Sequence, residues 1–293
     1  MKFLKMNGIG NDFILIDYRG REGLYSEEAL SGMARHLCDR HLSIGADGLI
    51  LIEKARGEGD FRMRFFNADG SIGEMCGNGA RCVCRYGYER GISGKRQHVE
   101  TMSGLITGER INRREYRILM NPPSMIQLRK KIEVSSGKRI CGYVEFGMPG
   151  LPHAVVRVPG LSKMQVEEQE ALRALGREIR HGKEFPKGAN VNFYDMEEDG
   201  AFYLKTFERG VEDFTYACGS GSAATAVILK LSGMVKKEEM LFRMRGGQLA
   251  VRVVSEKSGT GQGAFGVREV WLSGLTNMVA FGELTDEEFL KKA

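Results

Sequence analysis

The chain has 293 residues, of which 42% are apolar, so it can bury sizeable cores, and its length favours two domains. The net charge of +5 suits an anionic small molecule, whereas nucleic-acid binding rests on charge alone because few aromatic side chains lie between the basic clusters. Polar residues interrupt the N-terminal apolar run and the rest of the chain has no apolar stretch of membrane-spanning length, so we expect a cytoplasmic protein with no membrane partner.

The first half of the chain predicts several strands around a helix. Ser26 is a suitable N-cap because two glutamates follow it, and their charges favour the positive end of a helix. Leu30, Met33 and Leu37 then form an apolar stripe at helical spacing. Runs of β-branched and aromatic residues predict strands at 11–18, 48–53 and 61–67.

The second half predicts the same order of elements. Leu172, Leu175 and Ile179 repeat the helical stripe, and Gly182 lies where that helix would end. Strands are predicted at 154–158, 190–194 and 201–207. Residues 125–144, between the halves, are basic, and we expect an irregular join there.

The two halves match at a constant offset of 142 residues, which separates Cys76 from Cys218. The matched pairs include Gly8 with Gly150, Leu30 with Leu172, Gly48 with Asn190, Asn67 with Arg209, Gly77 with Gly219, and Asn78 with Ser220. Five separate features in one register indicate an internal repeat. The predicted fold class is therefore α+β, with two pseudo-symmetric domains that each place strands around a helix.

A cysteine opens an alanine-rich, helical stretch in each half, at residues 80–88 and 223–231. Unpaired N–H groups and a partial positive charge make a helix start a carboxylate site. The glycine after each cysteine lets the backbone approach a ligand, and Asn78 or Ser220 can cap the helix or donate another hydrogen bond. We expect the same positive end to lower the pKa of both thiols toward neutrality.

Two such helix ends facing one another across a cleft would hold a small acid between two sulfurs. One thiolate would remove the α-proton while the opposite thiol returns a proton to the other face, which inverts the centre. The helix dipoles would stabilise the carbanion, so this chemistry requires no cofactor.

Other uses of the cysteines are weaker alternatives. Cys76 and Cys218 could be small buried apolar residues, although the flanking glycines argue against this. A nucleophilic thiol of the protease kind needs one cysteine and explains the duplication badly. The remaining four lack the repeated glycine-rich setting and are expected in the core: Cys38, Cys82, Cys84 and Cys141. Their spacing does not predict a metal site.

At this level of detail the chain resembles the diaminopimelate epimerase family. The motifs that carry the resemblance run in order from residue 1 to about 231: MKFLKMNGIGNDFILID, CDRHLSIGADG, FFNADGSIGEMCGNGARC, PHAV, NVNF and FERGVEDFTYACGSG. The closing WLSGLTNMVAFGEL resembles the family's last strand. The resemblance implies a cofactor-independent two-base mechanism, sheets wrapped about central helices, and an active site in the cleft between the domains.

The resemblance also implies roles for individual residues. Cys76 and Cys218 would be the acid and base, and His153 and Glu208 would tune their thiols. Substrate contacts would come from Asn11, Asn67, Gly77, Asn78, Asn190, Glu208, Arg209, Gly219 and Ser220. Arg209 would pair with a distal carboxylate, and the backbone carbonyl of Glu208 would accept the α-amino group. The alternatives are turn roles for the three lone asparagines, a core role for His153 and a surface ion pair for Arg209.

One departure from the family pattern bears on the substrate. The family reads Asn-Pro-His where this chain has Leu151, Pro152 and His153. Loss of an amide beside a buried carboxylate weakens binding by about 1 to 3 kcal/mol, which relaxes specificity without touching the mechanism. The expected reaction is conversion of LL-diaminopimelate to the meso form, in lysine and peptidoglycan biosynthesis. The alternative is a racemase of another polar amino acid such as histidine.

The repeat and the resemblance together predict the domain boundaries. Residues 1–121 would form the first domain, residues 122–274 the second, and residues 275–293 would return to the first. The expected partner is a small amino-acid substrate, and a homodimer is the candidate assembly.

Overall fold

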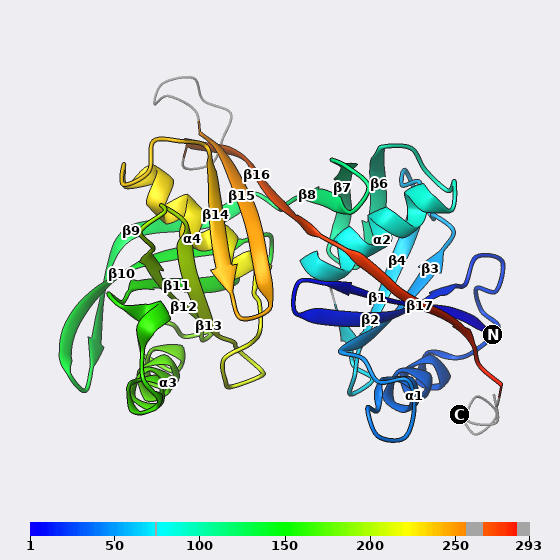
Figure 1. Cartoon of the computed structure of the whole chain (residues 1–293), viewed down its shortest axis with the longest axis horizontal. Helices are drawn as coiled ribbons and strands as arrows, with labels where there is room; N and C mark the ends of the chain where they lie inside the picture. The colour runs from blue at the N-terminus through cyan, green and yellow to red at the C-terminus, as the bar shows by residue number, and fades with distance from the viewer. Residues whose placement is uncertain (74, 256–265, 286–293) are drawn as a thin grey trace. The chain divides into compact units, whose positions relative to one another are not determined.

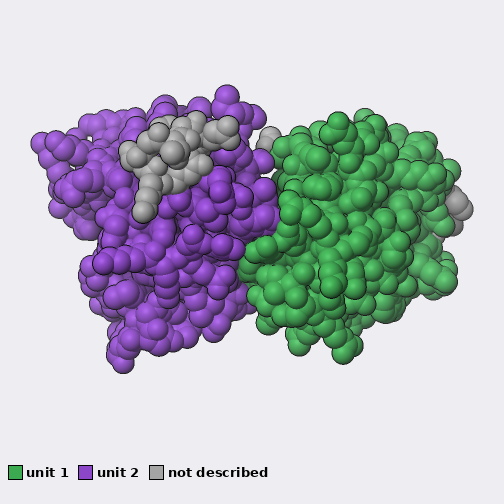
Figure 2. All heavy atoms as spheres, turned by 90° about the horizontal axis from the view of Figure 1, so that it is seen from above, with its two compact units in different colours: residues 1–118, 273–293 green, residues 119–272 purple. Residues whose placement is uncertain are grey.

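The computed structural model describes residues 1–73, 75–255 and 266–285, in two compact units coloured separately in Figure 2. Unit 1 comprises residues 1–118 with 273–293, and unit 2 comprises residues 119–272. The described part of the chain has no helix both long and apolar enough to cross a membrane.

Unit 1 surrounds one helix with strands (Figure 1). Its elements are β1 (Lys2–Gly8), β2 (Asn11–Asp17), α1 (Glu27–Cys38), β3 (Gly48–Glu53), β4 (Phe61–Asn67), β5 (Ile72–Gly73), α2 (Gly77–Glu89), β6 (Arg96–Thr101), β7 (Gly104–Arg110), β8 (Glu115–Leu119) and β17 (Asn277–Glu283). Helix α2 packs against β1, β2 and β7, and α1 packs against β3 and β4. The C-terminal strand β17 pairs antiparallel with β1, which in turn pairs with β2.

Unit 2 repeats this plan. Its elements are β9 (Pro123–Val134), β10 (Gly137–Phe146), β11 (Leu151–Arg157), η1 (Leu161–Lys163), α3 (Val166–Arg180), β12 (Asn190–Met196), β13 (Phe202–Phe207), α4 (Gly219–Leu231), β14 (Glu239–Met244), β15 (Gly247–Ser255) and most of β16 (Val267–Leu275), whose residues from Ser273 onward belong to unit 1. Helix α4 packs against β10, β11, β12 and β15, and α3 packs against β9, β12 and β13. The mostly apolar sequence of α4 is buried on all sides, as a central helix requires.

The predicted repeat is confirmed in the elements that it builds. Ser26 caps α1 by accepting a hydrogen bond from the backbone N–H of Ala29, and α3 ends at Arg180, two residues before Gly182. The apolar stripe of α1 lies in one core cluster, and the matching stripe of α3 lies in the other. The predicted α+β class, with a sheet around a central helix in each half, is therefore correct.

The predicted irregular join at residues 125–144 is wrong. Strands β9 and β10 form an antiparallel hairpin there, with Gly137 opposite Val134. Most of β9 is exposed on one or both faces, which is why its sequence is polar and basic rather than apolar. Gly137 adopts a φ of 111°, so the Ser-Ser-Gly turn before β10 was the available signal for a hairpin.

Candidate active site

A tight turn places the first amide of the site. Strands β1 and β2 are joined by Ile9 and Gly10, with φ of 53° and 82°, the two-residue turn that matches strand twist. A β-branched residue in the left-handed region is strained. Gly8 precedes the turn, and a Cβ there would lie 2.8 Å from the backbone oxygen of Asn78. The hairpin can therefore approach the start of α2 closely only with glycine at this position.

The start of α2 brings three predicted residues together. Cys76 is the N-cap, in extended conformation, and the first N–H groups of α2 lack intrahelical partners. Asn78 Nδ2 donates to Asn11 Oδ1 at 2.6 Å and to the backbone oxygen of Ile9 at 3.4 Å. Asn11 Nδ2 in turn donates to Asp47 Oδ2 at 3.1 Å. The amides of Asn11 and Asn78 are thus oriented by a continuous chain of hydrogen bonds.

Asn67 lies at the end of β4 and has a turn role in this structure. Its Nδ2 donates to Ser71 Oγ at 2.9 Å, and its backbone N–H donates to the backbone oxygen of Ser71. These bonds close the loop between β4 and β5. They do not connect Asn67 to Asn11 or Asn78, so its predicted contact with a substrate stays a prediction.

The start of α4 holds the second thiol. Cys218 is the N-cap, and its Sγ accepts a hydrogen bond from the backbone N–H of Gly221 at 3.3 Å. The Ser220 hydroxyl lies 3.5 Å from the same sulfur. The Cys218 side chain is 7% exposed, so the sulfur is largely withdrawn from water.

The expected lowering of the Cys218 pKa is wrong. Burial raises the pKa of this thiol to about 12, and the carboxylate of Glu208 acts in the same direction. The hydrogen bonds from Ser220, Gly221 and Thr206 oppose this rise without cancelling it. Desolvation of the thiolate is the largest of these effects, so Cys218 is a protonated thiol at neutral pH.

A buried polar network links Cys218 to His153. The Thr206 hydroxyl contacts the Cys218 sulfur and donates to Asn192 Oδ1 at 2.9 Å. Asn192 Nδ2 lies 3.2 Å from His153 Nδ1 and donates to the backbone oxygen of Ala154 at 2.9 Å. Thr206 and Asn192 were not identified from the sequence as site residues. The only available signal was the position of Asn192 within the NVNF motif.

His153 is the neutral end of this network. Its side chain is fully buried on β11, and burial lowers its pKa to about 3. Asn192 has only N–H donors to offer at Nδ2, so Nδ1 of His153 accepts and its proton lies on Nε2. The contacts that connect His153 to Cys218 run through Asn192 and Thr206, and the predicted tuning of a thiol by His153 stays a prediction.

The loop after β13 carries the remaining charged candidates. The backbone N–H of Arg209 donates to Asn190 Oδ1 at 2.8 Å, while its exposed guanidinium donates to the backbone oxygen of Lys187 at 3.2 Å. Burial raises the pKa of Glu208, and its backbone oxygen accepts from the N–H of Glu212. Asn190 thus fixes the backbone of Arg209 and leaves the guanidinium at the surface.

The strand register corrects the predicted match of Asn67 with Arg209. Gly48 lies opposite Asn67 in unit 1, whereas Val191 lies opposite Phe207 in unit 2. Asn190, the match of Gly48, is therefore next to Glu208 rather than Arg209. The second copy has one more residue between this position and its cysteine, so a gapless offset misaligned the pair.

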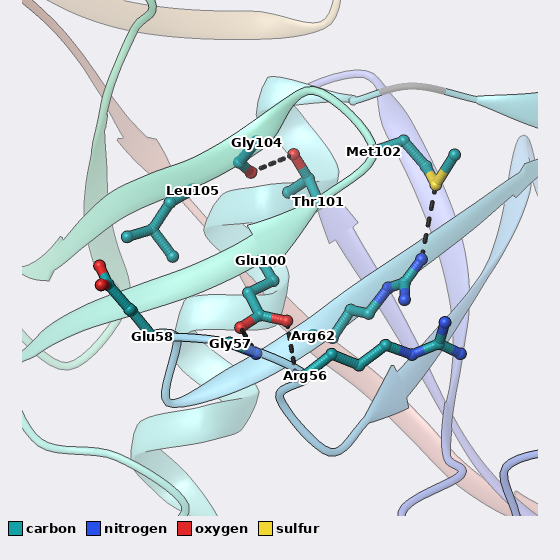
Figure 3. Close-up of a pocket in the computed structure, with 9 residues that line it drawn as sticks. All are labelled: Arg56, Gly57, Glu58, Arg62, Glu100, Thr101, Met102, Gly104 and Leu105. Atoms are coloured by element: carbon teal, nitrogen blue, oxygen red, sulfur yellow. Dashed lines mark hydrogen bonds between the residues drawn. The ribbon is translucent and has the colours of Figure 1, made fainter.

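A separate surface pocket in unit 1 contains none of these residues. Its volume is about 510 Å³, and its lining is drawn in Figure 3: Arg56, Gly57, Glu58, Arg62, Glu100, Thr101, Met102, Gly104 and Leu105. The Glu100 carboxylate accepts backbone N–H groups of Arg56 and Gly57 at 2.8 and 2.7 Å, which satisfies it within the loop. Within the described residues, no cluster of His, Cys, Asp and Glu could hold a metal ion.

Comparisons with known proteins assign the chain to a family. The sequence profile described as Diaminopimelate epimerase matches residues 3–126 and again residues 146–269. The diaminopimelate epimerase of Aquifex aeolicus (strain VF5) is 39% identical over 98% of this chain and 99% of its own length. That of Hydrogenobaculum sp. (strain Y04AAS1) is 37% identical over 99% of this chain and 100% of its own length.

Solved structures share the fold at low identity. A probable proline racemase from Agrobacterium radiobacter K84 has a TM-score of 0.69 and 17% identity, over 99% of this chain and 95% of that one. A hydroxyproline epimerase from Agrobacterium vitis has a TM-score of 0.69 and 18% identity, over 99% and 94%. The doubled profile match and the near-full-length identity carry the assignment, and the chain belongs to the diaminopimelate epimerase family.

Proposed function

We propose that this chain converts LL-diaminopimelate to the meso form, using Cys76 and Cys218 as the two acid–base groups. The observation that carries the proposal is the repeated helix start: each cysteine is an N-cap in extended conformation, followed by residues whose N–H groups open the helix. Family membership makes the chain an isomerase of the epimerase type. The pairing of two such thiols accounts for inversion at one carbon.

The reaction needs one thiolate and one thiol at the start of each turnover. The thiolate takes the α-proton and becomes a thiol, and the electron pair of the broken C–H bond delocalises into the carboxylate. The opposite thiol then gives its proton to the other face of the α-carbon and becomes a thiolate. Burial keeps Cys218 protonated at neutral pH, so in the resting protein it is the thiol of the pair.

Helix-end N–H groups would stabilise the developing charge. We assign the reacting carboxylate to the N–H groups of Gly77, Asn78, Gly219 and Ser220, because a helix start stabilises an anion most where charge increases. Arg209, with its exposed guanidinium, would pair with the distal carboxylate. The remaining contacts would come from Asn11, Asn67, Asn190 and the backbone oxygen of Glu208.

Proton NMR in D₂O tests this function directly. Purified protein is mixed with LL-diaminopimelate, and in parallel with L-histidine and other L-amino acids. We expect the α-proton signal of LL-diaminopimelate to disappear while the meso product forms. No exchange and no product with this substrate, from folded protein with reduced thiols, would remove the proposal.

Leu151 motivates a second candidate, a racemase of another polar α-amino acid. Leu151 is half-buried at the start of β11, opposite Phe146 and two residues before His153. A leucyl group cannot donate the hydrogen bond that the family's asparagine offers to a distal group. Exchange with histidine but not with diaminopimelate would establish this candidate, and Leu151→Asn should then shift the preference toward diaminopimelate.

The cellular setting and assembly follow as proposals from the same function. We propose a role in lysine and peptidoglycan biosynthesis, in the cytoplasm, with a homodimer as the assembly. Light scattering of the purified protein tests the homodimer, and a mass of one chain at micromolar concentration would exclude it.

A further inference from the structure

Arg81 is a charged side chain in an unusual place. It lies in α2, five residues after the N-cap Cys76. Among the fully buried side chains in the described part of the chain, that of Arg81 is the largest. Its neighbours along the helix are small or apolar, including Ala80, Cys82 and Val83, which are buried with it. A buried cation is retained in a core only when something compensates its loss of water.

The hydrogen bonds of Arg81 do not supply that compensation. Arg81 Nη2 donates to Asn78 Oδ1 at 2.6 Å, which is a neutral acceptor. The Nε and Nη1 atoms are buried and have no hydrogen-bond partner among the described residues. A guanidinium with five N–H donors is therefore largely unpaired, a strongly unfavourable arrangement unless negative charge faces it.

Among the described residues, the ionisable groups that act on Arg81 are three thiols: Cys82, Cys76 and Cys84. Burial raises the pKa of Cys82 and of Cys84 to about 12, so both stay neutral at physiological pH. Cys76 differs from them because it is partly exposed and lies at the positive end of α2. Burial lowers the pKa of Arg81 itself to about 10, which still leaves the guanidinium charged at neutral pH.

We propose that Arg81 is a positioning residue whose buried guanidinium stabilises Cys76 as a thiolate and, through Asn78, orients the amide that bonds Asn11. This inference deepens the proposed function, on which its catalytic meaning rests. A thiolate at Cys76 supplies the missing negative charge, and the cation would lower the energy of that thiolate in each catalytic cycle.

The matching position in the second copy of the repeat carries no cation. Ala223 stands at the position that matches Arg81, and the charged group that acts on Cys218 is the carboxylate of Glu208. The two thiols are therefore distinguished before any substrate arrives: a cation favours the thiolate at Cys76, and an anion disfavours it at Cys218.

The test is a titration of the individual thiols without substrate. Protein is alkylated briefly with iodoacetamide between pH 5 and 10, and modification of each cysteine is followed by peptide mass spectrometry. We expect Arg81→Met to raise the alkylation midpoint of Cys76 by at least about one pH unit, so that its rate at pH 7 falls about 10-fold. Arg81→Lys, which keeps the charge, should restore most of that rate.

Arg85 provides a matched control in the same helix. It is 8% exposed, its Nη1 donates to the backbone oxygen of Thr276 at 2.6 Å, and its Nε lies 3.5 Å from Glu89. Arg85→Met should leave the Cys76 midpoint unchanged. An unshifted midpoint in folded Arg81→Met protein, or an equal shift in Arg85→Met protein, would overturn the proposal.

The wild-type protein keeps the proposal testable if Arg81→Met does not fold. We expect Cys76 to titrate below pH 8 and to react faster than Cys218 at pH 7, and a Cys76 midpoint of about 9 or higher would reject the role of Arg81. Because this readout needs no turnover, it separates the two proposals. A low Cys76 midpoint without epimerisation refutes the function, and epimerisation with a high midpoint refutes the role of Arg81.

Discussion

The two helix starts have nearly the same backbone conformation at the cysteine and differ in the groups that surround its sulfur. Cys76 has φ and ψ of −128° and 117°, and Cys218 has −132° and 107°. The first thiol lies near a buried cation, whereas the second lies near Glu208 and a neutral hydrogen-bond network. Duplication thus preserved the backbone geometry of the helix start, while the charged side chains around the sulfur changed. A two-base reaction needs this difference, because one group must begin as base and the other as acid.

The largest expected effect on activity follows from removing either sulfur. We expect Cys76→Ala and Cys218→Ala each to lower kcat/KM by roughly 10³-fold or more, because each removes a general acid or base. Exchange of the α-proton in D₂O measures this. Cys141→Ala is the matched control, since Cys141 lies in the core cluster of unit 2 and should retain activity. Comparable activity in either catalytic variant would exclude the two-thiol scheme.

Much of this comparison was predictable from the sequence, because cysteine, glycine and amide side chains recur at one spacing in both halves. The surroundings of the thiols were not, because Asn192 and Thr206 come from different strands and meet Cys218 only after the sheet folds. Arg81 stood within a quoted motif, but its burial depends on packing that periodicity does not reveal. The basic hairpin was not predicted because its strand β9 is largely exposed. Its sequence therefore lacks the alternation of apolar and polar residues that indicates a strand.

Replacing the matched glycines Gly79 and Gly221 by alanine should destabilise the two helix starts to different extents. A Cβ on Gly221 would lie 2.1 Å from Asn192 Oδ1, whereas one on Gly79 would lie 3.1 Å from the tip of Ile50. We expect Gly221→Ala to destabilise the protein by about 2 kcal/mol through overpacking. Gly79→Ala should stay within about 1 kcal/mol of wild type, because a gain in helix propensity offsets a milder contact. Urea unfolding measures both, and equal losses would contradict the assigned packing.

The pH dependence of folding stability should test whether His153 is neutral in the folded protein. Folding lowers the pKa of His153 to about 3, so the unfolded chain binds the extra proton below about pH 6.5. The contribution of His153 to stability is therefore complete above pH 6.5 and is lost as pH falls toward 3. Between pH 7.5 and 5, His153→Gln should lose about 2 kcal/mol less stability than wild type.

Urea unfolding at the two pH values measures this difference. An unchanged acid sensitivity in His153→Gln protein would mean that the imidazole is protonated in the folded state.

The smallest expected effect concerns a single hydroxyl. Thr206 contacts the Cys218 sulfur and lowers the pKa of that thiol against the effect of burial, which requires its hydroxyl proton to turn from Asn192 Oδ1 to the sulfur when Cys218 ionises. Thr206→Val should slow alkylation of Cys218 about 3- to 10-fold at pH 9, the loss of one hydrogen bond, and leave Cys76 unaffected. Thr206→Ser should restore the rate. Thr225→Val, which removes a hydroxyl bonded within α4, should not slow it, and equal slowing in both variants would contradict a specific contact.

The pairing of β1 with β17 has a consequence for biosynthesis. β1 begins at residue 2, but β17, which pairs with it, spans Asn277–Glu283. Unit 2 is continuous in sequence and can form as soon as its own residues leave the ribosome. In unit 1, by contrast, the edge of β1 stays unpaired until β17 has been translated. The nascent first half, with Cys76 and the buried cation of α2, therefore carries an unpaired strand edge during translation, the feature that a chaperone would shield.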